Sequence, residues 1–348
     1  MITVSTKTVF LFPGQGAQYR GMGLDLLEKG GAAVKGLFAL ASETMGRDMA
    51  ALLAGADDAS LKRSDISQPA VTLVNLAAAA FLGERGIRPA ACAGFSLGEY
   101  AALVTAGVIT AEDCFRLVKL RGRAMQAASD RIAGEAAAAG GSGSISGGGD
   151  GDNAPGMAAV IGLAPERVEE LVAAWKEAGL EGLYGANFNS PKQVVVSGTA
   201  AALAEAQARF KEAGARRVIR LQVAGPFHSP LMADAAGAFA PALEKTAFRD
   251  PVIPCFSNVT GKRVSAGKDA KELALKQIVC PIYWTREEAA VEAEGAGAAL
   301  EAGPGRVLQG LWRDSGSAVP CYPAGTVPDI EALFSTEIKP GTPQEAAG

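Results

Sequence analysis

The pattern of apolar residues changes its period several times along the chain. Residues 8–12 and 89–93 are short apolar runs, which are typical of buried strands in a parallel sheet. Residues 24–83 and 99–104 are instead rich in helix formers, with short breaks in the longer stretch. Strands that alternate with helices predict an α/β fold around a parallel sheet.

A second pattern occupies residues 156–222. Here we expect a strand, a helix, two strands, a helix and a strand, over residues 157–162, 165–178, 181–186, 193–196, 200–213 and 217–223. This βαββαβ order is typical of a ferredoxin-like unit. It predicts a small domain that is inserted into the larger one.

Changes in composition mark the predicted domain boundaries. Glycine and serine dominate residues 140–151, a composition with too little apolar surface to build a core. We therefore predict a discontinuous large domain, a flexible insert, a small domain and a disordered tail. Their residues are 1–130 with 225–337, 131–154, 155–224 and 338–348, respectively.

Composition excludes several classes of function. The chain has 348 residues, is 49% hydrophobic and carries a net charge of −4, which favours neither a nucleic acid nor an anionic membrane as partner. No signal peptide is evident, and we find no apolar run long enough to cross a bilayer. The five cysteines are widely spaced without a CxxC pair, so we expect reduced thiols, a cytoplasmic protein and no metal site.

Residues 94–98, Gly-Phe-Ser-Leu-Gly, stand between an apolar run and a helical one. A serine between two glycines at such a junction is typical of a nucleophile elbow, since side chains in place of the glycines would collide with the tight turn. Free N–H groups at the helix start would then favour negative charge near Ser96. The large domain is therefore predicted to be α/β-hydrolase-like.

His228 is the only histidine, so any imidazole base must be this residue. Prolines at 226 and 230 stiffen its segment, which lies where the chain leaves the predicted small domain. A lone histidine is more often structural than catalytic. A cleft at that junction would nevertheless let His228 meet Ser96.

Two further residues each allow two interpretations. Gln15 lies in a glycine-rich loop after the first strand, where it either offers an N–H to an oxyanion or is a solvated turn residue. Arg121 falls on or beside the apolar stripe of a helix predicted over residues 111–129. It is either a surface arginine or a partly buried guanidinium that can bind a carboxylate through two parallel hydrogen bonds.

Several local expectations concern the connections. Ser67-Gln68-Pro69 resembles a helix start. Residues 187–191 are expected on the middle connection of the small domain, where the asparagines either satisfy a turn or face the cleft. Residues 252–256 are predicted to form a strand, followed by a turn at 258–261.

Six motifs occur in an order that resembles one known family. They are residues 12–18 (FPGQGAQ), 94–100 (GFSLGEY), 121–126 (RGRAMQ), 187–191 (NFNSP), 225–229 (GPFHS) and 303–305 (GPG). Together they resemble malonyl-CoA:acyl carrier protein transacylases and the acyltransferase domains of polyketide synthases. The resemblance covers about residues 8–323, apart from the glycine-rich insert.

The resemblance implies a ping-pong acyl transfer without a cofactor. Ser96 would attack malonyl-CoA with His228 as general base, and the thiol of acyl carrier protein phosphopantetheine would then attack the malonyl ester. Backbone N–H groups of Leu97 and Gln15 would form the oxyanion hole, and Arg121 would hold the malonyl carboxylate. The family orients its histidine through a backbone carbonyl, which matches Gln277 here. The resemblance also suggests a monomer.

The same resemblance assigns five residues to the substrate pocket: Phe95, Met125, Asn187, Asn189 and Phe227. Phe95 stands where the family usually has histidine, which affects pocket shape rather than the base. Phe227 favours malonyl over the bulkier methylmalonyl group. The insert, which follows the Arg121 helix, could shade the entrance.

Other functions are compatible with parts of the pattern. A serine hydrolase would share the elbow but would normally carry its acid and histidine late in the chain, whereas 120 residues follow His228. A non-catalytic carrier-binding module would not need Ser96, His228 and Arg121 together. We expect a role in fatty acid biosynthesis, with a polyketide or malonate decarboxylase system as the alternative.

Overall fold

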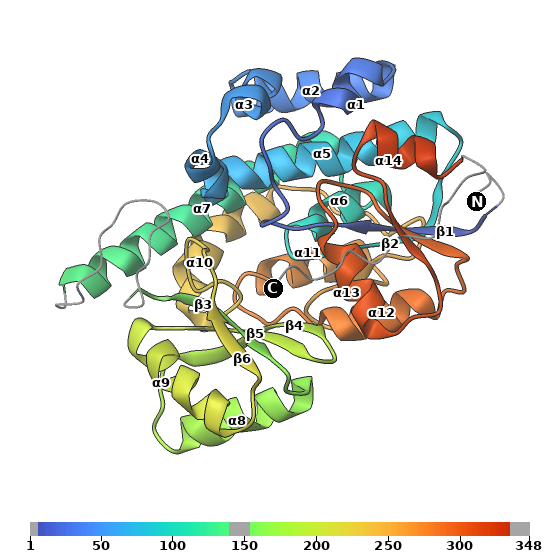
Figure 1. Ribbon diagram of the computed structural model, residues 1–348. Helices are drawn as coiled ribbons and strands as arrows, with labels where there is room; N and C mark the ends of the chain where they lie inside the picture. Colours follow the sequence, from blue (N-terminus) through green and yellow to red (C-terminus); the bar gives the residue numbers. More distant parts are fainter. Residues whose placement is uncertain (1–5, 139–153, 335–348) are drawn as a thin grey trace.

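The computed structural model describes residues 6–138 and 154–334. Two sheets organise this part of the chain (Figure 1). One belongs to a large α/β unit built from both ends of the sequence, and the other to a small unit inserted between them. The α/β fold with an inserted ferredoxin-like unit is therefore confirmed.

The large sheet consists of β1 (Thr8–Phe12), β2 (Pro89–Gly94), β9 (Ala298–Glu301) and β10 (Cys321–Pro323). Its strands are parallel in the order β10-β9-β1-β2. Every residue of β1 is buried, because alternate side chains enter two different clusters. Phe10 and Phe12 pack among the helices of one face, while Val9 and Leu11 pack with Trp284 and Trp312 on the other.

Helices complete the large unit. They are α1 (Leu24–Lys29), α2 (Ala32–Met45), α3 (Met49–Gly55), α4 (Asp58–Lys62), α5 (Ser64–Glu84), α6 (Gly98–Thr105), α7 (Ala111–Ala138), α10 (Ala233–Glu244), α11 (Gly267–Lys276), α12 (Trp284–Glu292), α13 (Val307–Ser315) and α14 (Val327–Ala332). In Figure 1, α5 and α7 run beside each other on the side of the sheet opposite α12 and α13. The short helix η1 (Pro230–Met232) follows His228.

Helix α5 corrects one expectation. It begins at Ser64, so Ser67-Gln68-Pro69 is not a helix start, and Pro69 lies inside the helix. The start is set by a contact from α7, since the Ser64 N–H donates to Gln126 Oε1 at 2.8 Å. By length and composition alone, α5 could also cross a membrane. However, 78% of its apolar window is buried inside the protein, as in the core helix of a globular fold.

The small unit follows the predicted order. It contains β3 (Gly156–Ile161), α8 (Pro165–Glu177), β4 (Leu183–Ser190), β5 (Gln193–Gly198), α9 (Ala200–Glu212) and β6 (Arg217–Arg220). The sheet order is β4-β5-β3-β6, all antiparallel, and α8 and α9 cover one face (Figure 1). A separate apolar cluster holds this unit together, so it has a core of its own.

The structure extends β4 beyond its predicted end. Asn187 and Asn189 lie on this strand and not on the connection, because backbone pairing continues to Ser190. A second partner supports the extension: the Phe188 N–H donates to the Ile282 carbonyl at 2.8 Å, and the Ile282 N–H donates to the Ala186 carbonyl at 2.8 Å. Strand β4 thus joins the small unit to the large one.

Two other boundaries differ from prediction. The strand expected over 252–256 is only β7 (Phe256–Ser257), paired with β8 (Lys262–Arg263), and Val252 is exposed. Helix α7 continues past Ser129 to Ala138, into the predicted insert. Residues 139–153 of that insert and the predicted tail lie outside the described residues. The domain boundaries inferred from composition stay a prediction.

Candidate active site

The segment from Gly94 to Gly98 forms a sharp turn between β2 and α6. Ser96 has a φ of 50°, in the left-handed region that residues other than glycine rarely adopt. A Cβ atom on Gly94 would lie 2.1 Å from the backbone of Gly98, and one on Gly98 would lie 1.9 Å from the Phe12 carbonyl oxygen. Both glycines are therefore required by close backbone contacts, and the turn has the geometry of a nucleophile elbow.

His228 lies next to this serine. The distance from Ser96 Oγ to His228 Nε2 is 2.8 Å, and the distance from His228 Nδ1 to the Gln277 carbonyl oxygen is also 2.8 Å. A carbonyl oxygen can only accept, so Nδ1 carries the proton and Nε2 presents its lone pair to the serine hydroxyl. This arrangement lets the imidazole take the hydroxyl proton.

Burial keeps His228 neutral. Its side chain is 4% exposed, and desolvation, with a smaller effect of the Arg121 charge, lowers its pKa to about 3 against the opposing hydrogen bond to Gln277. The unfolded chain would take up this proton near pH 6.5. The contribution of the neutral imidazole to the free energy of unfolding is thus complete above about pH 6.5 and is lost as the pH falls toward 3.

We expect the imidazole to stay neutral across the pH range of ordinary assays. Because His228 is the only histidine, protein labelled with ¹³C at histidine Cε1 should give one ring signal. Its chemical shift should stay constant from about pH 8 to about pH 5, since the lowered pKa lies below that window. A titration midpoint near that of free histidine, about 6.5, would contradict this geometry.

Two backbone N–H groups lie beside the nucleophile without partners. Those of Leu97 and Gln15 donate to no residue in the described part of the chain. The Ser96 N–H, in contrast, donates to Asn258 Oδ1 at 2.6 Å. The half-buried Gln15 side chain donates to Ser64 Oγ at 3.2 Å. The two free N–H groups could serve an oxyanion.

Arg121 is not a surface residue. It is 1% exposed; Nη1 donates to Gln68 Oε1 at 2.9 Å and Nη2 to Gln277 Oε1 at 3.0 Å. Its Nε is buried without a partner, and no carboxylate of the described residues lies within ion-pair distance. Desolvation lowers its pKa, but an arginine stays charged in proteins. Among the described residues, this buried cation therefore has no carboxylate in direct contact.

The Gln277 side chain connects this cation to the elbow. Its Oε1 accepts from Arg121, while its Nε2 donates to the Ser96 carbonyl at 3.0 Å and to Glu99 Oε2 at 2.7 Å. Its own backbone carbonyl meets His228. One residue thus contacts the nucleophile, the imidazole and the arginine.

The remaining predicted pocket residues lie at different distances from this centre. Phe95 is half-buried and packs edge-on against Trp284, with ring centroids 5.5 Å apart. Its ring therefore packs against the core cluster that contains Val9, Leu11 and Trp284. Met125 is buried, and its Sδ accepts a hydrogen bond from Gln68 Nε2 at 3.3 Å. The same Gln68 side chain accepts a hydrogen bond from Arg121.

Phe227 and the two asparagines lie where the two units meet. The Phe227 carbonyl accepts a hydrogen bond from Ser197 of β5, which fixes the backbone beside His228. Asn187 Oδ1 and Asn189 Oδ1 are buried without partners, while Asn189 Nδ2 donates to Gln193 at 2.9 Å. Because both asparagines lie on β4, they do not satisfy a turn, and their place in the substrate pocket stays a prediction.

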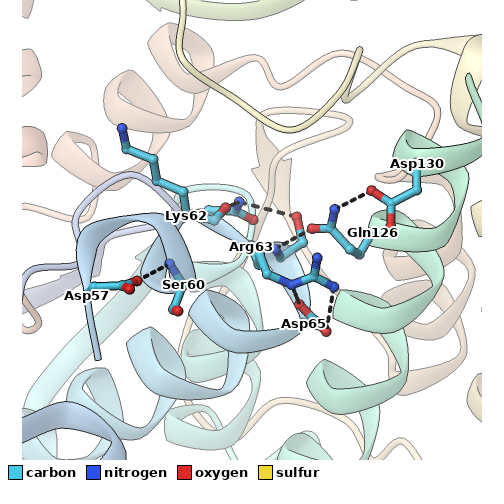
Figure 2. Close-up of polar contacts among 9 residues, drawn as sticks. Asp57, Ser60, Lys62, Arg63, Asp65, Gln126 and Asp130 are labelled. Carbon is cyan, nitrogen blue, oxygen red and sulfur yellow. Dashed lines mark hydrogen bonds and ion pairs between the residues drawn. The ribbon is translucent and has the colours of Figure 1, made fainter. Parts of the chain in front are cut away.

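The junction of α4 and α5 forms one side of the site. Figure 2 shows Arg63 against Asp65 and Gln126 against Asp130, with closest contacts of 3.0 and 2.8 Å. Lys62 Nζ donates to Gln222 Oε1 at 2.9 Å and so connects α4 to the segment after β6. A cavity of about 570 Å³ opens beside Arg63, but the predicted site residues do not line it.

The sequence analysis missed two residues of this site. Gln68 accepts a hydrogen bond from Arg121, and Asn258 accepts one from the Ser96 N–H. No role in the site was expected for either residue. The available signal for Gln68 was a long polar side chain next to the apolar stretch of its helix. Asn258 gave no signal, because asparagine is common in turns. The described residues contain no group of three or more His, Cys, Asp or Glu side chains that could hold a metal ion.

A strained serine beside a neutral histidine, with two free N–H groups, defines an acyl-transfer or hydrolytic enzyme of the serine type. Comparison with known proteins narrows this class. The chain matches the acyl transferase domain family over residues 9–181 and 134–330. It is an acyltransferase by fold and sequence.

Individual relatives specify the family further. The malonyl CoA-acyl carrier protein transacylase of Bacillus subtilis is 37% identical over 306 residues, which cover 88% of this chain and 89% of that protein. The crystal structure of a malonyl-CoA:acyl carrier protein transacylase from Xanthomonas oryzae has a TM-score of 0.81 and 35% identity, over 94% of this chain and 97% of that one. The chain belongs to the malonyl-CoA:acyl carrier protein transacylase family.

A second similar structure contains a carrier protein. It is a malonyl-transacylase in complex with its type II PKS acyl-carrier protein, with a TM-score of 0.82 and 32% identity. It covers 94% of this chain and 99% of that chain. The similarity therefore includes a malonyl-transacylase whose carrier protein belongs to a type II PKS.

Proposed function

We propose that the protein transfers a malonyl group from malonyl-CoA to the phosphopantetheine thiol of acyl carrier protein, in fatty acid biosynthesis. The buried, unpaired Arg121 carries this proposal. A buried guanidinium without a carboxylate in direct contact is costly, and a substrate carboxylate would compensate it. Malonyl thioesters carry such a carboxylate, whereas acetyl thioesters do not.

The first half-reaction forms an ester on Ser96. Its Oγ attacks the thioester carbonyl carbon while His228 Nε2 takes the hydroxyl proton. The N–H groups of Leu97 and Gln15 stabilise the oxyanion of the tetrahedral intermediate. The C–S bond then breaks, the electron pair leaves with sulfur, and the imidazolium returns its proton to the CoA thiolate.

The second half-reaction runs this sequence in reverse with a different thiol. The carrier thiol replaces CoA, His228 Nε2 accepts its proton, and the sulfur attacks the ester carbonyl. The C–O bond to Ser96 breaks and the proton returns to Oγ. Throughout, the Gln277 carbonyl accepts a hydrogen bond from the His228 Nδ1–H group, so no carboxylate is needed to orient the imidazole.

Replacing Arg121 with alanine tests the proposal. We expect the ratio of kcat/KM for malonyl-CoA to that for acetyl-CoA to fall by ~10²-fold or more, the usual effect of removing one partner of a buried ion pair. Acetyl transfer should hold or rise. Arg121→Lys should recover only part of the ratio, because an ammonium cannot make two parallel bonds.

Arg123→Ala is the matched control, because Arg123 is an exposed arginine two positions further on the same helix. Its ratio should equal that of the native enzyme. An unchanged ratio in Arg121→Ala would refute carboxylate recognition by Arg121. Release of free malonate at the same rate with and without carrier protein would indicate a hydrolase instead.

We further propose that the enzyme needs no cofactor and acts as a cytoplasmic monomer that binds neither nucleic acid nor membrane. Its five cysteines are unpaired, as is usual in a reducing compartment. The negative net charge and the burial of α5 agree with the absence of nucleic acid and membrane partners. The carrier protein belongs to fatty acid synthesis in this proposal, with a polyketide carrier as the alternative.

A further inference from the structure

Asn258 lies directly behind the nucleophile, at the turn between β7 and β8. It is 0% exposed. Its Oδ1 accepts from the Ser96 N–H at 2.6 Å and from Gln277 Nε2 at 3.1 Å. Its Nδ2 donates to the Gly94 carbonyl at 2.7 Å and to Glu287 Oε2 at 2.6 Å. The amide thus uses all of its hydrogen-bonding positions.

The backbone fixes which way this amide points. The Ser96 N–H can only donate and the Gly94 carbonyl can only accept, so Oδ1 must face Ser96 and Nδ2 must face Gly94. The two contacts bracket the elbow at positions 94 and 96. A single side chain therefore clamps the turn from both ends.

This clamp acts on a strained residue. Ser96 has a φ of 50°, and backbone in that region persists only where its surroundings hold it. We propose that Asn258 is a positioning residue that maintains the left-handed conformation of Ser96 and thereby aims Oγ at His228. It also keeps the Ser96 N–H engaged, so that the free N–H of Leu97 faces the substrate.

The surroundings explain why an amide occupies this position. The Asn258 N–H donates to Glu99 Oε2 at 3.0 Å, so two carboxyl groups, Glu99 and Glu287, contact this residue. Burial raises the pKa of Glu99 to about 7 and that of Glu287 well above its usual value. An aspartate would add a third carboxyl group here and could not donate to both Gly94 and Glu287.

The inference rests on the proposed acyl transfer, so the test has two readouts. Single-turnover kinetics with malonyl-CoA measure formation of the Ser96 ester and the apparent affinity separately. A fluorophosphonate probe measures the reactivity of Ser96 without reference to the acyl group: a bond forms between Oγ and phosphorus, fluoride leaves, and His228 takes the proton.

For Asn258→Ala, we expect both rates to fall by ~10²-fold, the usual effect of a misplaced reacting group. The apparent affinity for malonyl-CoA should change less than about threefold, because Arg121 and its contact with Gln68 remain. A merely structural residue would lower the folded fraction instead. It would leave the rate per folded molecule unchanged.

The Asn258→Asp variant tests the same role through the pH dependence of its rate, with a side chain of nearly the same shape. The protonated acid can accept from Ser96 and donate to Gly94, whereas the ionised form cannot donate to the Gly94 carbonyl. Its rate should therefore approach that of the native enzyme at low pH and fall as the pH rises. Native enzyme should lack this additional limb.

Leu53→Ala is the stability control, because Leu53 is a buried core residue on α3 without a polar role in the site. It should lower the melting temperature yet keep the native rate per folded molecule. Native-like labelling of Asn258→Ala by both reagents would overturn the inference. If native enzyme reacts with the fluorophosphonate but not with malonyl-CoA, the proposed function fails while Asn258 is still tested.

Discussion

Replacing Ser96 with alanine is expected to abolish the covalent malonyl adduct. The hydroxyl is the only group at this position that can attack, and its Oγ lies 2.8 Å from the imidazole. Mixed with malonyl-CoA, native enzyme should gain one malonyl group by intact-protein mass spectrometry. The variant should gain none and should lose essentially all transfer activity.

Folding of this variant should be nearly unchanged, because alanine adopts the same strained backbone and the close contacts belong to Gly94 and Gly98. A melting temperature within a few degrees of the native value is the control for an intact site. An adduct of equal yield on the alanine variant would refute Ser96 as the nucleophile.

Replacing His228 with alanine should lower the rate of adduct formation by ~10²–10⁴-fold, the usual contribution of a positioned general base. The imidazole lone pair faces the serine hydroxyl because Nδ1 is hydrogen-bonded to the Gln277 carbonyl. Nothing else among the described residues contacts Ser96 Oγ by a hydrogen bond. Stopped-flow or quenched single-turnover measurement gives the rate directly.

Chemical modification tests the same role in the unaltered chain. His228 is the only histidine, so inactivation by diethyl pyrocarbonate should follow the modification of one imidazole. Hydroxylamine should restore activity in parallel with the release of the modifying group. Fully modified enzyme that retains activity would show that another group accepts the proton.

Much of this site could be predicted from the sequence because its parts are local. The glycines around Ser96 are required by contacts within the same turn, and both strand runs, 8–12 and 89–93, show their burial in their composition. The order of strands and helices likewise predicted the inserted ferredoxin-like unit. Local steric contacts and hydrophobic periodicity depend only on residues that are close together in the sequence.

Boundaries and burial were less predictable, because distant residues decide them. Helix α5 begins at Ser64 through a contact from Gln126, and β4 extends to Ser190 beside a partner strand and the segment at Ile282. Arg121 allowed two interpretations from its helix alone. Only its tertiary contacts with Gln68 and Gln277 place it inside the protein.

The sequence by itself determined the α/β architecture, the elbow at Ser96, and that any imidazole base must be His228. The tertiary structure alone decided that His228 meets Ser96, that Arg121 is buried without a carboxylate in direct contact among the described residues, and that Asn258 clamps the elbow. The physical reason is distance along the chain. Hydrogen bonds between residues more than a hundred positions apart depend on packing of the whole fold, which no local pattern records.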